Sequence, residues 1–395
     1  MSSTVVTTHA PARASGLTLS KSETIPWYIW SCIAASTGIM SGLYWDISWH
    51  QTIGRDTFWT PAHLLIQFGA ILTAVSSSAL IFSTTFGRDE AAKRASVNVL
   101  GFRGPLGAFI SAWGGAAMLV SAPLDNWWHD AYGLDVKIIS PPHMLLALGI
   151  GGILWGGAIL VLGEMNRAQG TLRKRLEWML LLSGGLLVIL DMTIKLYDVS
   201  RVLMHTVYLY MVASIALPLV LEALARASGR RWARTTMASI YMGAFLLLLW
   251  IVPLFPGEPK LGPVYQHVTH MLPLAFPILL VAPALALDLL WPRMKTWGKW
   301  QASLVAGVTF VLVLMAVQWP FGSFLMSAAS RNWVFGTHYF YYAMPPSAHE
   351  VRHIFFQMEH TTWQVIKTLG IAFLAAIVST RLGITWGNWM REVRR

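Results

Sequence analysis

The sequence has almost no cysteine and few charged residues. The single cysteine, Cys32, lies inside an apolar run, so there is no disulfide framework and no CxxC pair for a structural metal. Only 12% of the residues are charged and 55% are hydrophobic, which excludes a chain built mainly of water-soluble domains. Residues 1–26 are polar, and after them the longest expected loop covers residues 326–361. We therefore expect the chain to lie almost entirely in a membrane.

Long apolar runs fill the rest of the chain. Each run has about 20 residues, the length that crosses a hydrocarbon core roughly 30 Å thick. In lipid only helices and closed barrels satisfy their own backbone, and runs of this length are typical of helices. We predict an all-α polytopic membrane protein with about ten transmembrane helices. They cover residues 27–49, 60–84, 104–122, 140–164, 176–195, 202–224, 234–254, 265–291, 301–325 and 362–384.

The net charge of +11 predicts a topology and not nucleic-acid binding. Lys and Arg cluster after the second, fourth, sixth and eighth runs and at the end of the chain, and the alternate connections contain few of them. By the positive-inside rule both termini and the even-numbered loops are cytoplasmic, that is, N-in and C-in. The helices then form five hairpins whose tips face outside. No A-x-A site follows the first run at a suitable distance, so we expect a retained helix there and not a signal peptide.

One ionisable motif occurs twice, at the tips of the first and second hairpins. Residues 46–69 read DISWHQTIGRDTFWTPAHLLIQFG, and residues 125–149 read DNWWHDAYGLDVKIISPPHMLLALG. Both follow Asp-x3-His, a spacer, and Ser/Thr-Pro-x-His-x-Leu-x3-Gly. Ionisable groups inside a membrane are costly, and most of them have a function. A pattern with this many matching positions is unlikely to occur twice by chance, so it indicates a true internal repeat. The candidate ligands are Asp46, His50 and His63 in the first copy and Asp125, His129 and His143 in the second.

The spacing within each copy predicts convergence on one ion. Asp46 and His50 are four residues apart, so on a helix they share a face. Thr60 is a predicted N-cap with Pro61 at the first helical position, which places His63 in the first turn of the next helix. An antiparallel hairpin brings these two helix ends together. The second copy repeats the arrangement.

The predicted ligand set does not by itself select a metal. Two imidazoles and a carboxylate with open coordination positions suit iron, copper or zinc. The plainer alternative is that these are interfacial histidines that pair with Asp or cap helices, beside tryptophans at the headgroups. That reading is common for a lone histidine, but a repeated set of three residues favours a metal.

The first copy resembles the metal-binding stretch of the C subunit of particulate methane and ammonia monooxygenases. That family has an Asp-x3-His-x12-His pattern around an Arg-Asp-Thr-x2-Thr-Pro-x-His core, and a second, Asn-x3-His-x13-His set downstream. Here Asp125 stands where the family has Asn. The resemblance covers about residues 40–150. The residues in register in the first copy are Asp46, His50, Arg55, Asp56, Thr57, Thr60, Pro61 and His63.

The resemblance implies a copper-dependent integral-membrane monooxygenase, or its metal-bearing subunit, that hydroxylates a small apolar substrate or ammonia with O2. It implies one or two copper ions and further subunits including a periplasmic copper domain. An oxygenase of this kind also needs electrons, and the expected donor is quinol or a periplasmic protein. The expected location is a bacterial-type inner or intracytoplasmic membrane with the motif loops facing the periplasm. The chain then divides into a polar N-terminus (1–26), two metal-motif hairpins (27–165) and a six-helix region without an assigned role (166–395).

Two further histidine groups are weaker candidates for metal ligands. His349, His353 and His360 lie on one stripe if residues 349–360 are helical, with His338 nearby. His267 and His270 are expected at the start of the eighth span. Asp191 and Lys195 are four apart and are expected to pair.

The alternative function is a non-catalytic membrane protein for metal or haem handling or for electron transfer. A haem protein would need axial histidines that face each other across the bundle. A third reading is an assembly subunit whose metal is structural.

Overall fold

Long helices make up nearly all of the computed structural model, which describes residues 24–54, 59–133, 140–195, 206–260, 268–325, 327–336 and 361–394. Eight helices in these ranges are long and apolar enough to cross a membrane. Over the same ranges the only sheet is a two-stranded hairpin, β1 (Val97–Val99) with β2 (Phe102–Gly104). The chain is therefore an all-α integral membrane protein.

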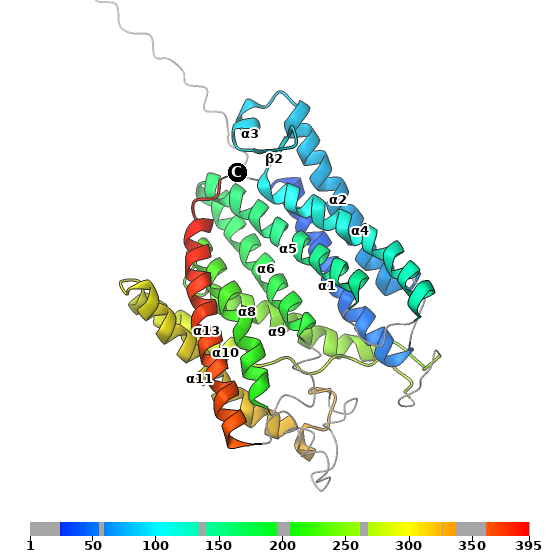
Figure 1. Ribbon diagram of the computed structural model, residues 1–395, viewed down its shortest axis with the longest axis vertical. Helices are drawn as coiled ribbons and strands as arrows, with labels where there is room; N and C mark the ends of the chain where they lie inside the picture. Colours follow the sequence, from blue (N-terminus) through cyan, green and yellow to red (C-terminus); the bar gives the residue numbers. More distant parts are fainter. Residues whose placement is uncertain are drawn as a thin grey trace, which may run out of the picture.

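The long helices form one bundle (Figure 1). They are α1 (Trp27–Thr52), α2 (Pro61–Phe86), α4 (Leu106–Tyr132), α5 (Pro141–Arg167), α6 (Gly170–Ile194), α8 (Val207–Ser228), α9 (Ala233–Ile251), α11 (Lys299–Leu325) and α13 (Thr362–Met390). The shorter elements are α3 (Glu90–Arg94), η2 (Val252–Leu254), α10 (Val281–Met294) and η3 (Ala328–Ser330). The eight candidate spans are these long helices without α1, whose sequence carries Trp, Tyr, Ser, Asp and His among its apolar residues.

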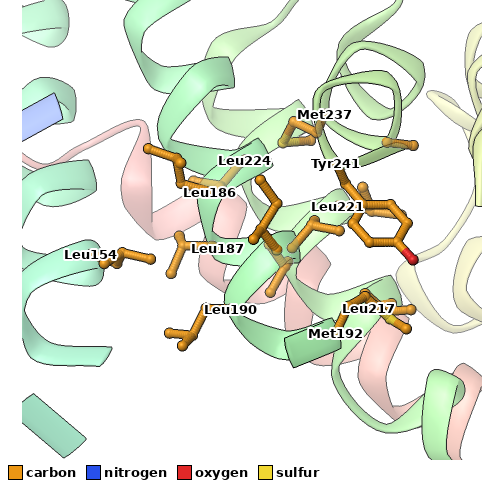
Figure 2. Close-up of a cluster of buried hydrophobic side chains, with 14 of the residues drawn as sticks. Leu154, Leu186, Leu187, Leu190, Met192, Leu217, Leu221, Leu224, Met237 and Tyr241 are labelled. Atoms are coloured by element: carbon orange, nitrogen blue, oxygen red, sulfur yellow. The ribbon is translucent and has the colours of Figure 1, made fainter. Parts of the chain in front are cut away.

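The apolar core lies where α5, α6, α8 and α9 meet. Figure 2 shows part of it, with leucines of α6 and α8 between Leu154 of α5 and the side chains of Met237 and Tyr241 of α9. Tyr241 is 1% exposed and Leu187 of α6 is 3% exposed. Because α1 and α2 pack together, and α4 packs on both α2 and α5, the two motif hairpins are adjacent in the bundle. The motif-bearing ends of α1 and α4 lie at the end of the bundle remote from the C-terminus (Figure 1).

The eighth predicted span is not a continuous helix, and this part of the prediction is wrong. Of the described residues in this run, 268–280 are non-helical, and the helix α10 begins at Val281. Pro273 and Pro277 explain the break, because proline lacks an N–H donor and forces the residue before it out of the helical region. Residues 271–278 are nonetheless all buried. Irregular backbone at membrane depth is tolerated only when protein surrounds it.

The backbone of this extended segment is satisfied by side chains of three helices. Ser48 Oγ of α1 donates to the carbonyl of Leu272 at 2.5 Å, and Thr52 Oγ1 accepts from the N–H of the same residue at 2.7 Å. Further N–H groups donate to Tyr44 of α1 (from Leu274, 3.1 Å), Tyr241 of α9 (from Ile278, 3.1 Å) and Gln318 of α11 (from Leu279, 2.8 Å). The segment thereby joins the C-terminal half of the chain to the helix that carries Asp46 and His50.

A buried ionic cluster joins α8, α9 and α10. Arg234 is 1% exposed and lies between two carboxylates, 2.6 Å from Glu222 Oε2 and 2.9 Å from Asp288 Oδ1. Asp288 also accepts from the backbone N–H of Thr235 at 2.8 Å. Pairing with several hydrogen bonds is what makes such burial tolerable. The cluster ties α8, α9 and α10 together within the C-terminal half of the chain.

Candidate metal centre

Asp46, His50 and His63 converge as the sequence predicts. Asp46 Oδ1 lies 3.6 Å from His50 Nε2 and 3.0 Å from His63 Nε2. One ligand atom from each of the three residues lies within 4.8 Å of the others. Over the described ranges this is the one such group of three or more His, Cys, Asp or Glu residues. The last turns of α1 and the first turn of α2 thus build a three-donor cluster.

The spacing and the hydrogen bonding of this cluster fit a metal ion. Ligands bound at about 2.1 Å with angles of about 90–110° lie roughly 3.0–3.4 Å apart, and the two distances from Asp46 Oδ1 are close to this range. Asp46 Oδ1 is buried, and the two imidazole nitrogens 3.0 and 3.6 Å away do not form a hydrogen bond with it. A buried carboxylate oxygen normally has a donor or an ion. Its side chain is 15% exposed, whereas that of His50 is 43% exposed, so the cluster opens on the His50 side.

The local sequence explains how the two helix ends meet. Thr60 is the N-cap residue of α2 with extended backbone, and Pro61 occupies the first turn, as predicted. The Thr60 side chain makes no capping hydrogen bond. Further along, the glycine that ends the motif allows close helix contact, because a Cβ at Gly69 would lie 2.6 Å from Ile39 Cγ1 and 3.0 Å from the carbonyl of Ala35. Small residues at such contacts let membrane helices approach closely.

The second copy has the same plan but is more open. His129 Nε2 lies 3.5 Å from Asp125 Oδ2, and His143 Nε2 lies 3.9 Å from Asp125 Oδ1. The two imidazoles thus face different oxygens of one carboxylate, and the side chain of Asp125 is 35% exposed. The closing glycine, Gly149, again meets the facing helix, since a Cβ there would lie 2.6 Å from Met118 Cγ and 2.9 Å from the carbonyl of Gly114. The three residues of the second copy are neighbours, but they are less closely grouped than Asp46, His50 and His63.

The remaining ring nitrogens of the second copy contact nearby polar groups. Ser140 is the N-cap residue of α5, yet its hydroxyl makes no capping bond and lies instead 2.9 Å from His143 Nδ1. His129 Nδ1 lies 3.3 Å from the carbonyl of Gly133. Contacts of this kind orient a metal-binding imidazole so that its Nε2 faces the ion. The predicted caps are thus correct in position, and Ser140 has a different hydrogen-bond partner from the one expected.

Several other candidates fall outside the described ranges. They are Arg55, Asp56, Thr57, His267, His338, His349, His353 and His360. His270 is described, and it forms a β-bridge with Pro256 and contacts Thr269 Oγ1 at 2.8 Å. It does not begin a helix as expected. Asp191 and Lys195 pair at 2.8 Å, as predicted.

The sequence did not predict the role of the opposite face of α1. Tyr44, Ser48 and Thr52 are spaced four residues apart and bind the extended segment. They are offset by two positions from Asp46 and His50, which on a helix is a rotation of about 200°. The signal was present as a polar stripe within an apolar run. Its partner, more than 200 residues away, could not be read from the sequence.

A scan against protein-family models, a search of curated proteins and a search of solved structures each found no match.

Proposed function

We propose that this membrane protein binds copper through Asp46, His50 and His63 and acts as a copper-dependent monooxygenase, or as its metal-bearing subunit. The observation that supports the proposal is the convergence of two imidazole nitrogens and one carboxylate oxygen within 4.8 Å. Imidazole suits copper, iron and zinc alike, so the preference for copper rests on the resemblance of the motif. The proposed substrates are small apolar molecules or ammonia, with O2 as co-substrate.

Each residue has a separate task in this proposal. The neutral Nε2 atoms of His50 and His63 donate electron pairs to the ion, and the Asp46 carboxylate offsets its positive charge. His50 is the most exposed of the three, so access from outside the bundle is on its side. Bound copper would supply the one-electron chemistry that activation of O2 requires. The second set, Asp125, His129 and His143, is proposed as a weaker site for a second ion.

The surroundings of the cluster suit a small apolar substrate. Trp59 and Trp127 are 73% and 54% exposed near the two hairpin tips, and tryptophan is typical of the membrane–water interface. A site at this depth receives apolar molecules that concentrate in the bilayer. The electron donor, quinol or a periplasmic protein, and a periplasmic copper-domain subunit are proposed partners. The motif loops are proposed to face the periplasm.

The first test measures metal in the purified protein, or in its native complex, after loading with copper and dialysis. The wild type should retain copper, and D46A, H50A and H63A should each lose most of it. D130A is a matched control, because Asp130 is an exposed carboxylate at the end of α4 outside both sets of ligands. Equal copper in the wild type and in all three variants would end the proposal.

A second test separates an oxygenase from a carrier. O2-dependent product formation from methane, short alkanes or ammonia, lost in H63A, would support the monooxygenase. Copper binding without any product in the complete native complex would instead favour metal handling, and a haem absorption band in the purified protein would favour electron transfer.

A further inference from the structure

A small apolar crevice lies beside the β1–β2 hairpin. The hairpin is at the end of the bundle near the C-terminus, remote from the motif-bearing helix ends (Figure 1). The crevice has a volume of about 250 Å³ and lies between α2 and α4, next to the β1–β2 hairpin. Its walls include Phe82 of α2, Phe102 of the hairpin, and Phe109 and Trp113 of α4. Ser78 is the single polar residue that lines it. Such a crevice suits a hydrocarbon chain.

The β-hairpin beside the crevice is amphipathic. Val99 pairs with Phe102, and both line the crevice. The neighbouring pair, Asn98 with Arg103, points to the other face, because side chains alternate along a strand. The hairpin therefore presents an apolar face to the crevice and carries Arg103 on its polar face.

The tip of this hairpin keeps an apolar residue in an unfavourable backbone conformation. Leu100 has φ 51° and Gly101 has φ 89°, which is the geometry of a tight turn that favours Asn-Gly. A bulky residue at positive φ is uncommon and strained. Leu100 is also 88% exposed and lines the mouth of the crevice. A leucine that is both strained and exposed at this position suggests contact with an apolar phase.

The crevice is continuous with the outer apolar surface of α2 and α4. Val75 of α2 and Trp113 of α4 are 63% and 65% exposed, and both helices are candidate membrane spans. An occupant therefore enters from the bilayer and not from water. This continuity favours lipid over a soluble ligand.

The adjacent segment is basic, and its acidic residues already have partners. Asp89 accepts hydrogen bonds from the backbone N–H groups of Ala91 and Ala92 at 2.9 and 3.0 Å, and Glu90 pairs with Lys93 at 3.1 Å. Three exposed arginines remain, and no ion pair involves them among the described residues. They are Arg88, Arg94 and Arg103. Arginine binds phosphate through two parallel N–H donors.

We infer that this crevice binds one acyl chain of an anionic phospholipid, with its phosphate held by the arginines of residues 88–103. The apolar walls bind the acyl chain, Leu100 at the hairpin tip inserts into the membrane–water interface, and the arginines select a negatively charged headgroup. The site is independent of the metal centre and of the proposed oxygenase activity.

The test uses the full chain in nanodiscs of phosphatidylcholine that contain a small fraction of phosphatidylglycerol with a photoreactive diazirine in its acyl chain. After illumination, mass spectrometry should locate the label between residues 78 and 113. Unlabelled phosphatidylglycerol should compete for this site, and a phosphatidylcholine probe should label it several-fold less.

Two variants and one control sharpen the result. S78F fills the crevice and should remove most of the local label, and R88Q/R94Q/R103Q should abolish the preference for phosphatidylglycerol. R293Q/K295Q/K299Q neutralises an equal number of basic residues in another connection and should change neither.

Three results would overturn the inference. They are equal labelling by both wild-type probes, label spread evenly along α2 and α4, and protection of the crevice by a tightly bound protein subunit. All three results are measured on the wild-type protein, so they would overturn the inference whether or not a variant folds.

Discussion

The two copies of the metal motif have almost the same sequence pattern but different geometry. In the α1–α2 hairpin one oxygen of Asp46 lies 3.0 and 3.6 Å from two imidazole nitrogens. In the α4–α5 hairpin the carboxylate of Asp125 uses its two oxygens separately, at 3.5 and 3.9 Å. The carboxylate is 15% exposed in the first copy and 35% exposed in the second. A shared motif therefore specifies which residues meet but not how closely.

The support behind each helix accounts for this difference. The last turns of α1 are held on their far face by the extended segment, through Tyr44, Ser48 and Thr52. The end of α4 instead exposes Trp127, Asp130 and Tyr132. It also contains Pro123, two residues before Asp125, and an internal proline removes a helical hydrogen bond and bends the helix. The tighter site lies on the better-supported helix.

Removal of the Asp carboxylate from one copy at a time should reveal the largest difference in copper affinity between the two copies. Loss of an outer hydrogen-bond partner of a metal site costs roughly 10- to 100-fold in affinity, so loss of a ligand, as in D46A, should cost at least about 100-fold. D125A should leave the tighter site intact and remove only the weaker one. Copper titration of both variants by calorimetry measures this, and equal losses in D46A and D125A would contradict the ranking.

Substitution of the closing glycines should have the next largest effect. A Cβ at Gly69 or Gly149 would overlap the facing helix, and overpacking of this kind costs typically about 1–3 kcal/mol. G69A should lower the thermal stability and weaken the first site, whereas G149A should act on the second. Gly151 is the matched control on α5, because a Cβ there meets nothing within 4 Å, so G151A should be neutral. Equal behaviour of G149A and G151A in a melting assay would refute the packing role.

Loss of the hydrogen bonds behind α1 should have a smaller effect, and this effect should be confined to the first copy of the motif. T52V removes the acceptor of the buried Leu272 N–H, and an unsatisfied buried donor costs about 1–3 kcal/mol. We expect a looser site, seen as a changed copper electron paramagnetic resonance spectrum and a several-fold weaker affinity. T52S keeps the hydroxyl and should restore both. A spectrum in T52V identical to that of the wild type would show that the extended segment does not position the site.

The sequence predicted much of this structure because hydropathy and local spacing carry the signal. The apolar runs correspond to long helices wherever the chain is described, apart from the eighth. The convergence of Asp46, His50 and His63 follows from a four-residue spacing and a helix start at Pro61. Local rules of this kind need no knowledge of distant contacts.

The parts that were missed depend on distant contacts. Pro273 and Pro277 were visible in the eighth run, but a hydropathy window does not distinguish a buried extended segment from a helix. Its stability depends on side chains such as Tyr44 and Gln318, which lie far away in the chain. The difference between the two copies likewise depends on what packs behind α1 and α4. Neither could be read from residues 40–150 alone.

The central claim is that one ion lies between the ends of α1 and α2. An anomalous-scattering map, collected at the copper edge from crystals of the copper-loaded protein, tests it most directly. The account predicts a strong peak about 2.0–2.2 Å from Asp46 Oδ1 and the Nε2 atoms of His50 and His63, with a weaker peak or none at Asp125. A fully loaded protein whose copper lies elsewhere, with these three side chains in direct contact only with one another, would contradict it.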